Sequence, residues 1–224
     1  MTPTGCPLTW GRASFSTSVA ADVGRRLADL VGAAILLALL SVPMLLIALA
    51  VRAEDRGSAL FRQERVGLGR RRFTLLKFRS MTEGVGDAGL RDLIARELRG
   101  EDTTTNGSSK LSDDGHVTRI GAFLRRTSLD ELPQLINVLR GDMALIGPRP
   151  CLEWEAEMFP AEYASRFTVR PGLTGLWQVS GRSTLGTLDM LRMDVEYVRM
   201  RSLRVDVGIL LRTVPAVLRR DGAR

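Results

Sequence analysis

The sequence predicts an α+β fold, mostly helical with short strands, in a monotopic membrane protein with a kinked re-entrant N-terminal helix. Three observations support this prediction. Residues 30–51 carry no charge over the length of about 20 residues that a bilayer-crossing helix needs, but Pro43 interrupts them. Apolar residues recur at helical spacing in later segments, most clearly within 203–220. Two short runs, 73–81 and 143–146, have the character of strands.

Three arrangements are compatible with the uncharged segment 30–51. It could be a cleaved secretory signal, because arginines precede it and 48–50 (Ala-Leu-Ala) is similar to a cleavage site. It could also be a simple transmembrane span. In the third arrangement, Pro43 kinks the helix, which then leaves the membrane on the side that it entered. Arg26 and Arg52 flank the segment, and a single crossing cannot keep both basic flanks cytoplasmic. The charges therefore favour the re-entrant helix.

Composition limits the partners of the chain. The formal net charge of +7 and a pI near 10.5 indicate anionic partners, such as a membrane surface or a phosphorylated substrate. Nucleic acid is not expected, because the basic residues are scattered, aromatic residues are few and no known reader motif is present. Cys6 and Cys151 are too few and too far apart for a disulfide framework or a metal cluster.

The region after the membrane segment is polar. Residues 63–72 form a basic, glycine-containing turn, and the run 73–81 alternates as a strand does. Lys77 and Arg79 are two residues apart, so a strand would place them on one face, which could also be merely solvated. A short amphipathic helix at 91–99 is expected next, before a loop.

Two adjacent carboxylates, Asp130 and Glu131, are the most informative polar pair. Ser128 stands three residues before Glu131, which is the spacing of a capping box, so a helix should begin somewhere in 128–133. The carboxylates would then lie at the positive end of that helix. Its apolar face is predicted from Leu135, Ile136 and Leu139.

Arginines surround the acidic pair in the sequence. Arg125 and Arg126 lie just upstream, and Arg149 stands between two prolines that restrict its backbone. A carboxylate among arginines suits a nucleophile or a metal ligand that acts on a phosphate. Taken alone, the pair also fits the ordinary acidic residues of a first helical turn.

The C-terminal half contains four further predicted segments. Residues 151–162 form an acidic helix or turn, and 170–182, with several glycines, is a loop. Helices are expected at 185–201 and 203–220. The second is amphipathic and basic, so its apolar stripe either packs in the core or lies in a membrane interface.

Three runs resemble the bacterial sugar transferases, the small monotopic polyprenol-phosphate phosphoglycosyl transferases. They are KFRSM at 77–81, TRIGAFLRRTSLDELPQLINVLRGDMALIGPRP at 118–150 and RPGLTGLWQVSGR at 170–182. The likeness extends from about Ala28 to Leu218. The family's membrane helix is broken at a Ser-Pro step, whereas this chain has Ser41-Val42-Pro43.

The resemblance implies an activity, the first membrane step of surface glycan assembly. A sugar 1-phosphate passes from a UDP-sugar to a polyprenol phosphate, giving a polyprenyl diphosphate-sugar and UMP through a covalent aspartyl phospho-sugar. Asp130 is the implied nucleophile and Mg²⁺ ligand, and Glu131 supports the metal, the lipid phosphate or proton transfer. The residues implied in binding phosphate oxygens are Lys77, Arg125, Arg149 and Arg182.

The resemblance also implies a division of the chain and a location. Residues 1–26 form a tail, 27–59 the re-entrant membrane helix, and 60–224 a catalytic domain that faces the cytoplasm from the bacterial inner membrane. Membrane lipids are therefore partners, and a homodimer remains compatible with the sequence. Two alternatives stay open: a membrane-anchored hydrolase that uses Asp130 and Glu131 as an acid/base pair, and a non-catalytic membrane-interaction protein.

Overall fold

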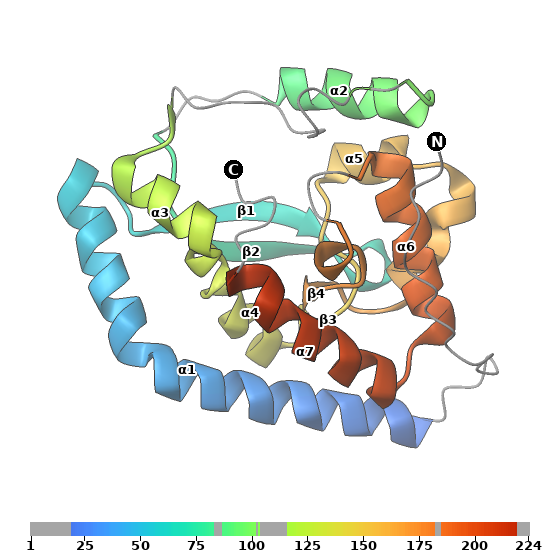
Figure 1. The fold of residues 1–224 in the computed structure, drawn as a ribbon, viewed down its shortest axis with the longest axis horizontal. Helices are drawn as coiled ribbons and strands as arrows, with labels where there is room; N and C mark the ends of the chain where they lie inside the picture. Colours follow the sequence, from blue (N-terminus) through green and yellow to red (C-terminus); the bar gives the residue numbers. More distant parts are fainter. Residues whose placement is uncertain (1–18, 83–86, 102, 104–115, 182–184, 219–224) are drawn as a thin grey trace.

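The computed structural model describes residues 19–82, 87–101, 103, 116–181 and 185–218. Over these residues the chain is mostly helical, with two small two-stranded sheets, which confirms the predicted mixture of helices and short strands. Figure 1 shows the helix α1 (Val19–Asp55) running along one side of a body that holds the sheets at its centre.

The helix α1 contains the predicted membrane segment. It is long and apolar enough to cross a membrane by length and composition, and it has Pro43 inside. The Ser41 hydroxyl donates to the Ala38 carbonyl at 2.8 Å, and the ribbon changes direction part-way along its length (Figure 1). The helix begins at Val19, within the predicted tail, and ends at Asp55 rather than residue 59.

One face of α1 packs on the body, and the opposite face is apolar and exposed. Ala33 is fully buried in a cluster with Leu135 and Val138 of α4 (Gln134–Arg140). By contrast, Leu39 and Leu46 on the outer face are 71% and 62% exposed. Exposed apolar area of this extent on one helix is typical of a membrane-facing surface.

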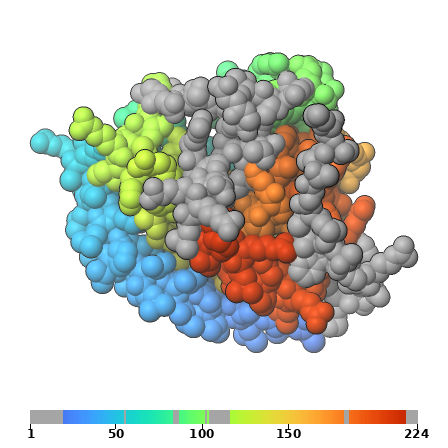
Figure 2. All heavy atoms as spheres, viewed as in Figure 1, coloured from blue at the N-terminus to red at the C-terminus, as the bar shows by residue number. Residues whose placement is uncertain are grey.

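The helix α7 (Leu203–Leu218) adds to this apolar surface. Figure 2 shows it next to α1, and the Arg25 guanidinium of α1 lies 3.3 Å from the Asp206 carboxylate of α7. Val207 and Leu211 are exposed, while Ile209 on the other side is buried. The helix was predicted for 203–220, and the structure confirms it; part of its apolar stripe packs in the core and part faces outward.

Two hydrogen-bonded contacts hold the start of α1 to the body. Arg26 donates to the carbonyls of Val138 and Leu139 at 2.8 and 3.2 Å. These carbonyls lie in the last turn of α4, where carbonyl groups have no partner within the helix. Asp29 accepts a hydrogen bond from the Leu145 amide at 2.9 Å. The helix α1 is thus joined to both α4 and the strand that follows it.

The first sheet is an antiparallel hairpin of β1 (Leu60–Val66) and β2 (Arg72–Phe78). The strand predicted at 73–81 is confirmed but ends earlier. The turn predicted from residue 63 is wrong in its first part, because 63–66 belong to β1. Most residues of β1 are exposed or half-exposed, so charged side chains occur on both faces and hide the alternation.

The second sheet pairs β3 (Ala144–Ile146) in parallel with β4 (Gly172–Thr174). The strand predicted at 143–146 is therefore confirmed, whereas the predicted loop 170–182 contains a strand. A Cβ atom at Gly172 would lie 2.0 Å from the Gly147 amide nitrogen, so the close approach of the two backbones requires glycine. That glycine content made the segment resemble a loop.

The remaining helices surround the sheets (Figure 1). Helices predicted at 91–99, 151–162 and 185–201 are present with somewhat different ends. A further helix, α3, was not predicted. The bounds are α2 Ala88–Leu98, α3 Arg119–Thr127, α5 Glu153–Met158 and α6 Thr187–Met200, with 3₁₀ turns η1 Leu68–Arg70, η3 Leu129–Glu131, η4 Ala161–Thr168 and η5 Trp177–Val179.

Candidate active site

The acidic pair lies on a short 3₁₀ turn rather than in the first turn of a long helix. Ser128 ends α3 in the left-handed conformation (φ 55°), and its side chain makes no capping hydrogen bond. The predicted capping box is therefore wrong. Asp130 and Glu131 fall in η3, and Pro133 stands at the N-cap of α4, where the N–H group that proline lacks would have no partner within the helix.

Asp130 is buried, with 9% of its surface exposed. Burial raises the pKa of its carboxyl to about 6, and the negative charge of Glu131 acts in the same direction. Three cations oppose this rise by favouring the ionised form, namely Lys77, Arg149 and Arg125 in order of effect. The structure therefore brings four other predicted site residues close enough to influence the Asp130 carboxylate.

Lys77 approaches from the end of β2. Desolvation by burial lowers the pKa of its ammonium group, and the charge of Asp130 counteracts this. The Nζ atom lies 5.1 Å from the centre of the Phe61 ring, on the paired strand β1. The ammonium group thus lies over an aromatic ring, and the charge of Asp130 favours its protonated form.

Arg149 pairs directly with Glu131. Its Nη1 atom donates to Glu131 Oε1 at 3.0 Å, and the charge of Glu131 raises the pKa of the guanidinium. The Arg149 side chain is 46% exposed, whereas that of Glu131 is 22% exposed. Donors that point toward solvent beside an ion pair remain available to an incoming phosphate group.

Arg166 and Asp194, which the sequence analysis did not predict, support the backbone of Arg149. Arg166 donates to the Arg149 carbonyl at 2.8 Å and forms a 2.8 Å ion pair with Asp194 of α6. The Arg166 and Asp194 side chains are 5% and 3% exposed, and burial raises the pKa of Asp194 to about 6. Their separation of 28 positions in the sequence gave no local signal of this pair.

Asn137, also missed, ties α4 to β2. It is fully buried; its Oδ1 atom accepts from the Leu76 amide at 3.0 Å, and its Nδ2 atom donates to the Thr74 carbonyl at 2.7 Å. The amide thus fixes the strand beside Lys77 against the helix that follows the acidic pair. The available clue was an uncharged polar residue between Ile136 and Leu139, which were both predicted to be on the apolar face.

The structure provides less evidence on the predicted metal site and on Arg182. Among the residues that the structure describes, no group of three or more His, Cys, Asp or Glu side chains could hold a metal ion. Asp130 and Glu131 are adjacent carboxylates, and this donor set fits Mg²⁺, which is commonly held by one or two carboxylates together with substrate phosphates. Arg182 lies outside the described residues.

Replacing the buried carboxylate should stabilise the metal-free protein in a pH-dependent way. The folded-state pKa of Asp130, about 6, is above the ordinary value of 3.8, so its ionised form destabilises the fold above pH 6. We expect Asp130→Asn to add on the order of 2 kcal/mol to the free energy of unfolding at neutral pH. The gain should shrink as pH falls through 6 and vanish below the unfolded-state pKa. Thermal melts in EDTA across this range measure it; an equal gain at every pH would contradict it.

Comparison with known proteins now identifies the class. The model of the bacterial sugar transferase family matches residues 20–220, so the chain belongs to that family. It is 44% identical over 215 residues to the UDP-glucose:undecaprenyl-phosphate glucose-1-phosphate transferase of Caulobacter vibrioides, covering 92% of this chain and 73% of that protein.

Two further relatives show how length varies. The UDP-galactose-lipid carrier transferase of Erwinia amylovora is 45% identical over 203 residues, which cover 89% of this chain but 41% of that protein. The exopolysaccharide production protein ExoY of Rhizobium meliloti is 39% identical over 195 residues, which cover 87% and 85%. The chain therefore spans less than half of the Erwinia protein and most of the Rhizobium protein.

Proposed function

We propose that this chain transfers a sugar 1-phosphate from a UDP-sugar to a polyprenol phosphate such as undecaprenyl phosphate, releasing UMP. Family membership and the names of the Caulobacter and Erwinia relatives support this activity. The Salmonella typhimurium undecaprenyl-phosphate galactose phosphotransferase, 42% identical over 171 residues, supports it as well. The observation that carries the proposal is a buried Asp130 beside Glu131, with three cations acting on it.

The transfer proceeds in two displacements at one phosphorus atom. An oxygen of the Asp130 carboxylate attacks the phosphorus that bears the sugar, and the bond from that phosphorus to the UMP oxygen breaks. The leaving UMP takes the electron pair, and the enzyme holds an aspartyl phospho-sugar. An oxygen of the lipid phosphate then attacks the same phosphorus, and the Asp130 carboxylate departs. Two easier steps thereby replace one difficult transfer between anions.

The cations have separate tasks in this scheme. Lys77 and Arg125 offset the negative charge that accumulates when a carboxylate meets a diphosphate. Arg149 holds a phosphate oxygen with the donors that it does not use on Glu131. Mg²⁺, bound through Asp130, supplies further charge neutralisation when present. By resemblance, Arg182 adds another phosphate contact.

The membrane arrangement brings the two substrates together. The exposed apolar faces of α1 and α7 support contact with membrane lipids. Arginines at both ends of the apolar segment, with Pro43 between them, favour a re-entrant helix over a crossing. The site then faces the cytoplasm at the bacterial inner membrane, where a soluble donor meets a lipid acceptor, as in the first membrane step of surface glycan assembly.

Nucleotide release tests the proposed activity. The detergent-solubilised protein, Mg²⁺, undecaprenyl phosphate and a panel of UDP-sugars are incubated together, and the released nucleotide is identified. We expect UMP, dependent on the lipid, with the productive donor naming the sugar. UDP would indicate simple glycosyl transfer. Free sugar phosphate without lipid would indicate a hydrolase, and no nucleotide from the whole panel would favour a non-catalytic role.

A further inference from the structure

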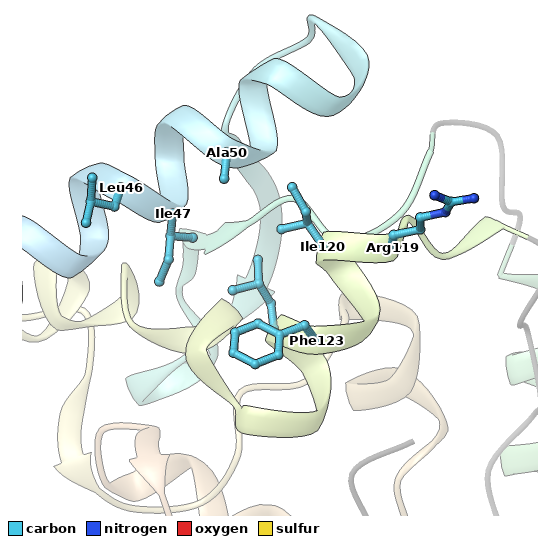
Figure 3. Close-up of a pocket in the computed structure, with 7 residues that line it drawn as sticks. Leu46, Ile47, Ala50, Arg119, Ile120 and Phe123 are labelled. Carbon is cyan, nitrogen blue, oxygen red and sulfur yellow. The ribbon is translucent and has the colours of Figure 1, made fainter.

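An apolar groove lies between the second half of α1 and the helix α3. It has a volume of about 470 Å³, within the roughly 300–1,000 Å³ of ligand pockets in general. Figure 3 shows Ile47 and Ala50 of α1 pointing toward Ile120 and Phe123 of α3 across this space. Arg119 also lines the groove, but its side chain extends away from the apolar side chains (Figure 3).

The rim and the floor of the groove differ in exposure. Leu46 and Phe123 on the rim are 62% and 47% exposed, so the groove is open along the apolar outer face of α1. Leu124 in the floor is 1% exposed. A chain lying in the membrane-facing surface could therefore enter from the side, without passing through water.

The floor of the groove packs against residues that are next to the candidate active site in the sequence. Leu124 belongs to a buried cluster with Phe78, and Leu129 packs against the same cluster. Phe78 directly follows Lys77, and Leu129 directly precedes Asp130. Leu124 is only six positions before Asp130, so the length of the chain keeps the floor of the groove within roughly 20 Å of Asp130.

We propose that this groove binds the first isoprene units of the acceptor lipid while the lipid phosphate lies at Asp130. The inference rests on the proposed function. An isoprenoid chain fits the site because the lining offers apolar carbon and no hydrogen-bonding partner for a headgroup other than the outward-turned Arg119. The groove would then fix the direction from which the acceptor phosphate reaches the phospho-sugar.

Filling the groove tests the proposal. Ala50→Phe places an aromatic ring in the space that the chain would use. Leu49→Phe is the matched control, since Leu49 is the neighbouring residue, is 56% exposed and does not line the groove. Binding of undecaprenyl phosphate to each detergent-solubilised protein is measured by native mass spectrometry, which needs no turnover. We expect roughly tenfold weaker binding for Ala50→Phe and no change for Leu49→Phe.

Turnover with acceptors of different length provides the second measurement. For Ala50→Phe we expect the KM for undecaprenyl phosphate to rise roughly tenfold. The KM for geranyl phosphate, which carries the first two isoprene units, should rise as well, whereas the KM for the UDP-sugar should stay nearly unchanged. Unchanged binding of undecaprenyl phosphate to Ala50→Phe, or an equal loss of binding in Leu49→Phe, would contradict the proposed role of the groove. Either result would indicate that the groove contacts bulk lipid only. Absence of UMP release from the wild-type protein would overturn the proposed function, while the binding comparison would still decide the groove.

Discussion

Asp130→Asn is expected to lower the rate of lipid-dependent UMP release about a thousandfold or more, because an amide cannot form the acyl phosphate. Asp130→Ala should behave in the same way. Both variants should keep their association with membranes, since the apolar face of α1 is unaffected. Asp189→Asn is the control, because Asp189 is an exposed carboxylate of α6 that pairs with Arg192 on the surface.

Release of UMP and flotation with vesicles are the two measurements for these variants. Near-normal turnover in either Asp130 variant would remove this residue from the role of nucleophile. Loss of membrane association together with loss of turnover would instead indicate that the variant had not folded.

Asp194→Ala is expected to produce the largest loss of stability, about 3–5 kcal/mol, because it leaves the buried Arg166 charge without its partner. The double variant Asp194→Leu with Arg166→Met should recover most of this loss, since apolar side chains can replace a buried pair. Chemical denaturation measures both effects. Asp189→Ala on the same helix should not change the stability measurably, because its ion pair is exposed.

The same double variant separates stability from positioning. Arg166 also donates to the Arg149 carbonyl, so the double variant loses a contact that positions Arg149 even if its stability is restored. We expect its kcat to stay well below that of the wild type even where its stability is restored. A double variant with restored stability and wild-type kcat would show that the pair serves the fold alone.

Local patterns were sufficient for the elements whose apolar residues repeat. The uncharged run of α1 and the apolar stripe of α7 depend only on spacing along the chain, and the structure confirms both helices. Family resemblance supplied the site residues. Among the described residues, Asp130 is acted on by the predicted Glu131 and by the three predicted cations.

Other features depended on contacts that no local pattern reveals. The helix α3 is an exception, because Ile120, Phe123 and Leu124 stand at helical spacing and the Thr118 side chain caps the helix through the Gly121 amide. Local pattern alone could therefore have predicted it. The strand β4 was predicted as a loop because of its glycines, which in the structure allow two backbones to approach closely. The left-handed Ser128 matched a capping motif in type and spacing, but the chain reverses there instead of starting a helix.

The buried ion pair gives the clearest case of tertiary information. Arg166 lies in η4 and Asp194 in α6, and neither segment indicates the other in the sequence. Their importance follows from burial, since a charge without solvent needs a partner. Asn137 is a similar case, because its side chain bonds two backbone groups of β2 that only the fold brings near.

The covalent step through Asp130 is the central claim, and a lipid-free reaction tests it most directly. The protein is mixed with Mg²⁺ and the productive UDP-sugar without acceptor, and UMP and the intact protein mass are followed together. We predict about one equivalent of UMP and a matching phospho-sugar mass on the peptide that contains Asp130, discharged when undecaprenyl phosphate is added. UMP that appears only when lipid is present, with no adduct on the protein, would contradict the two-step account.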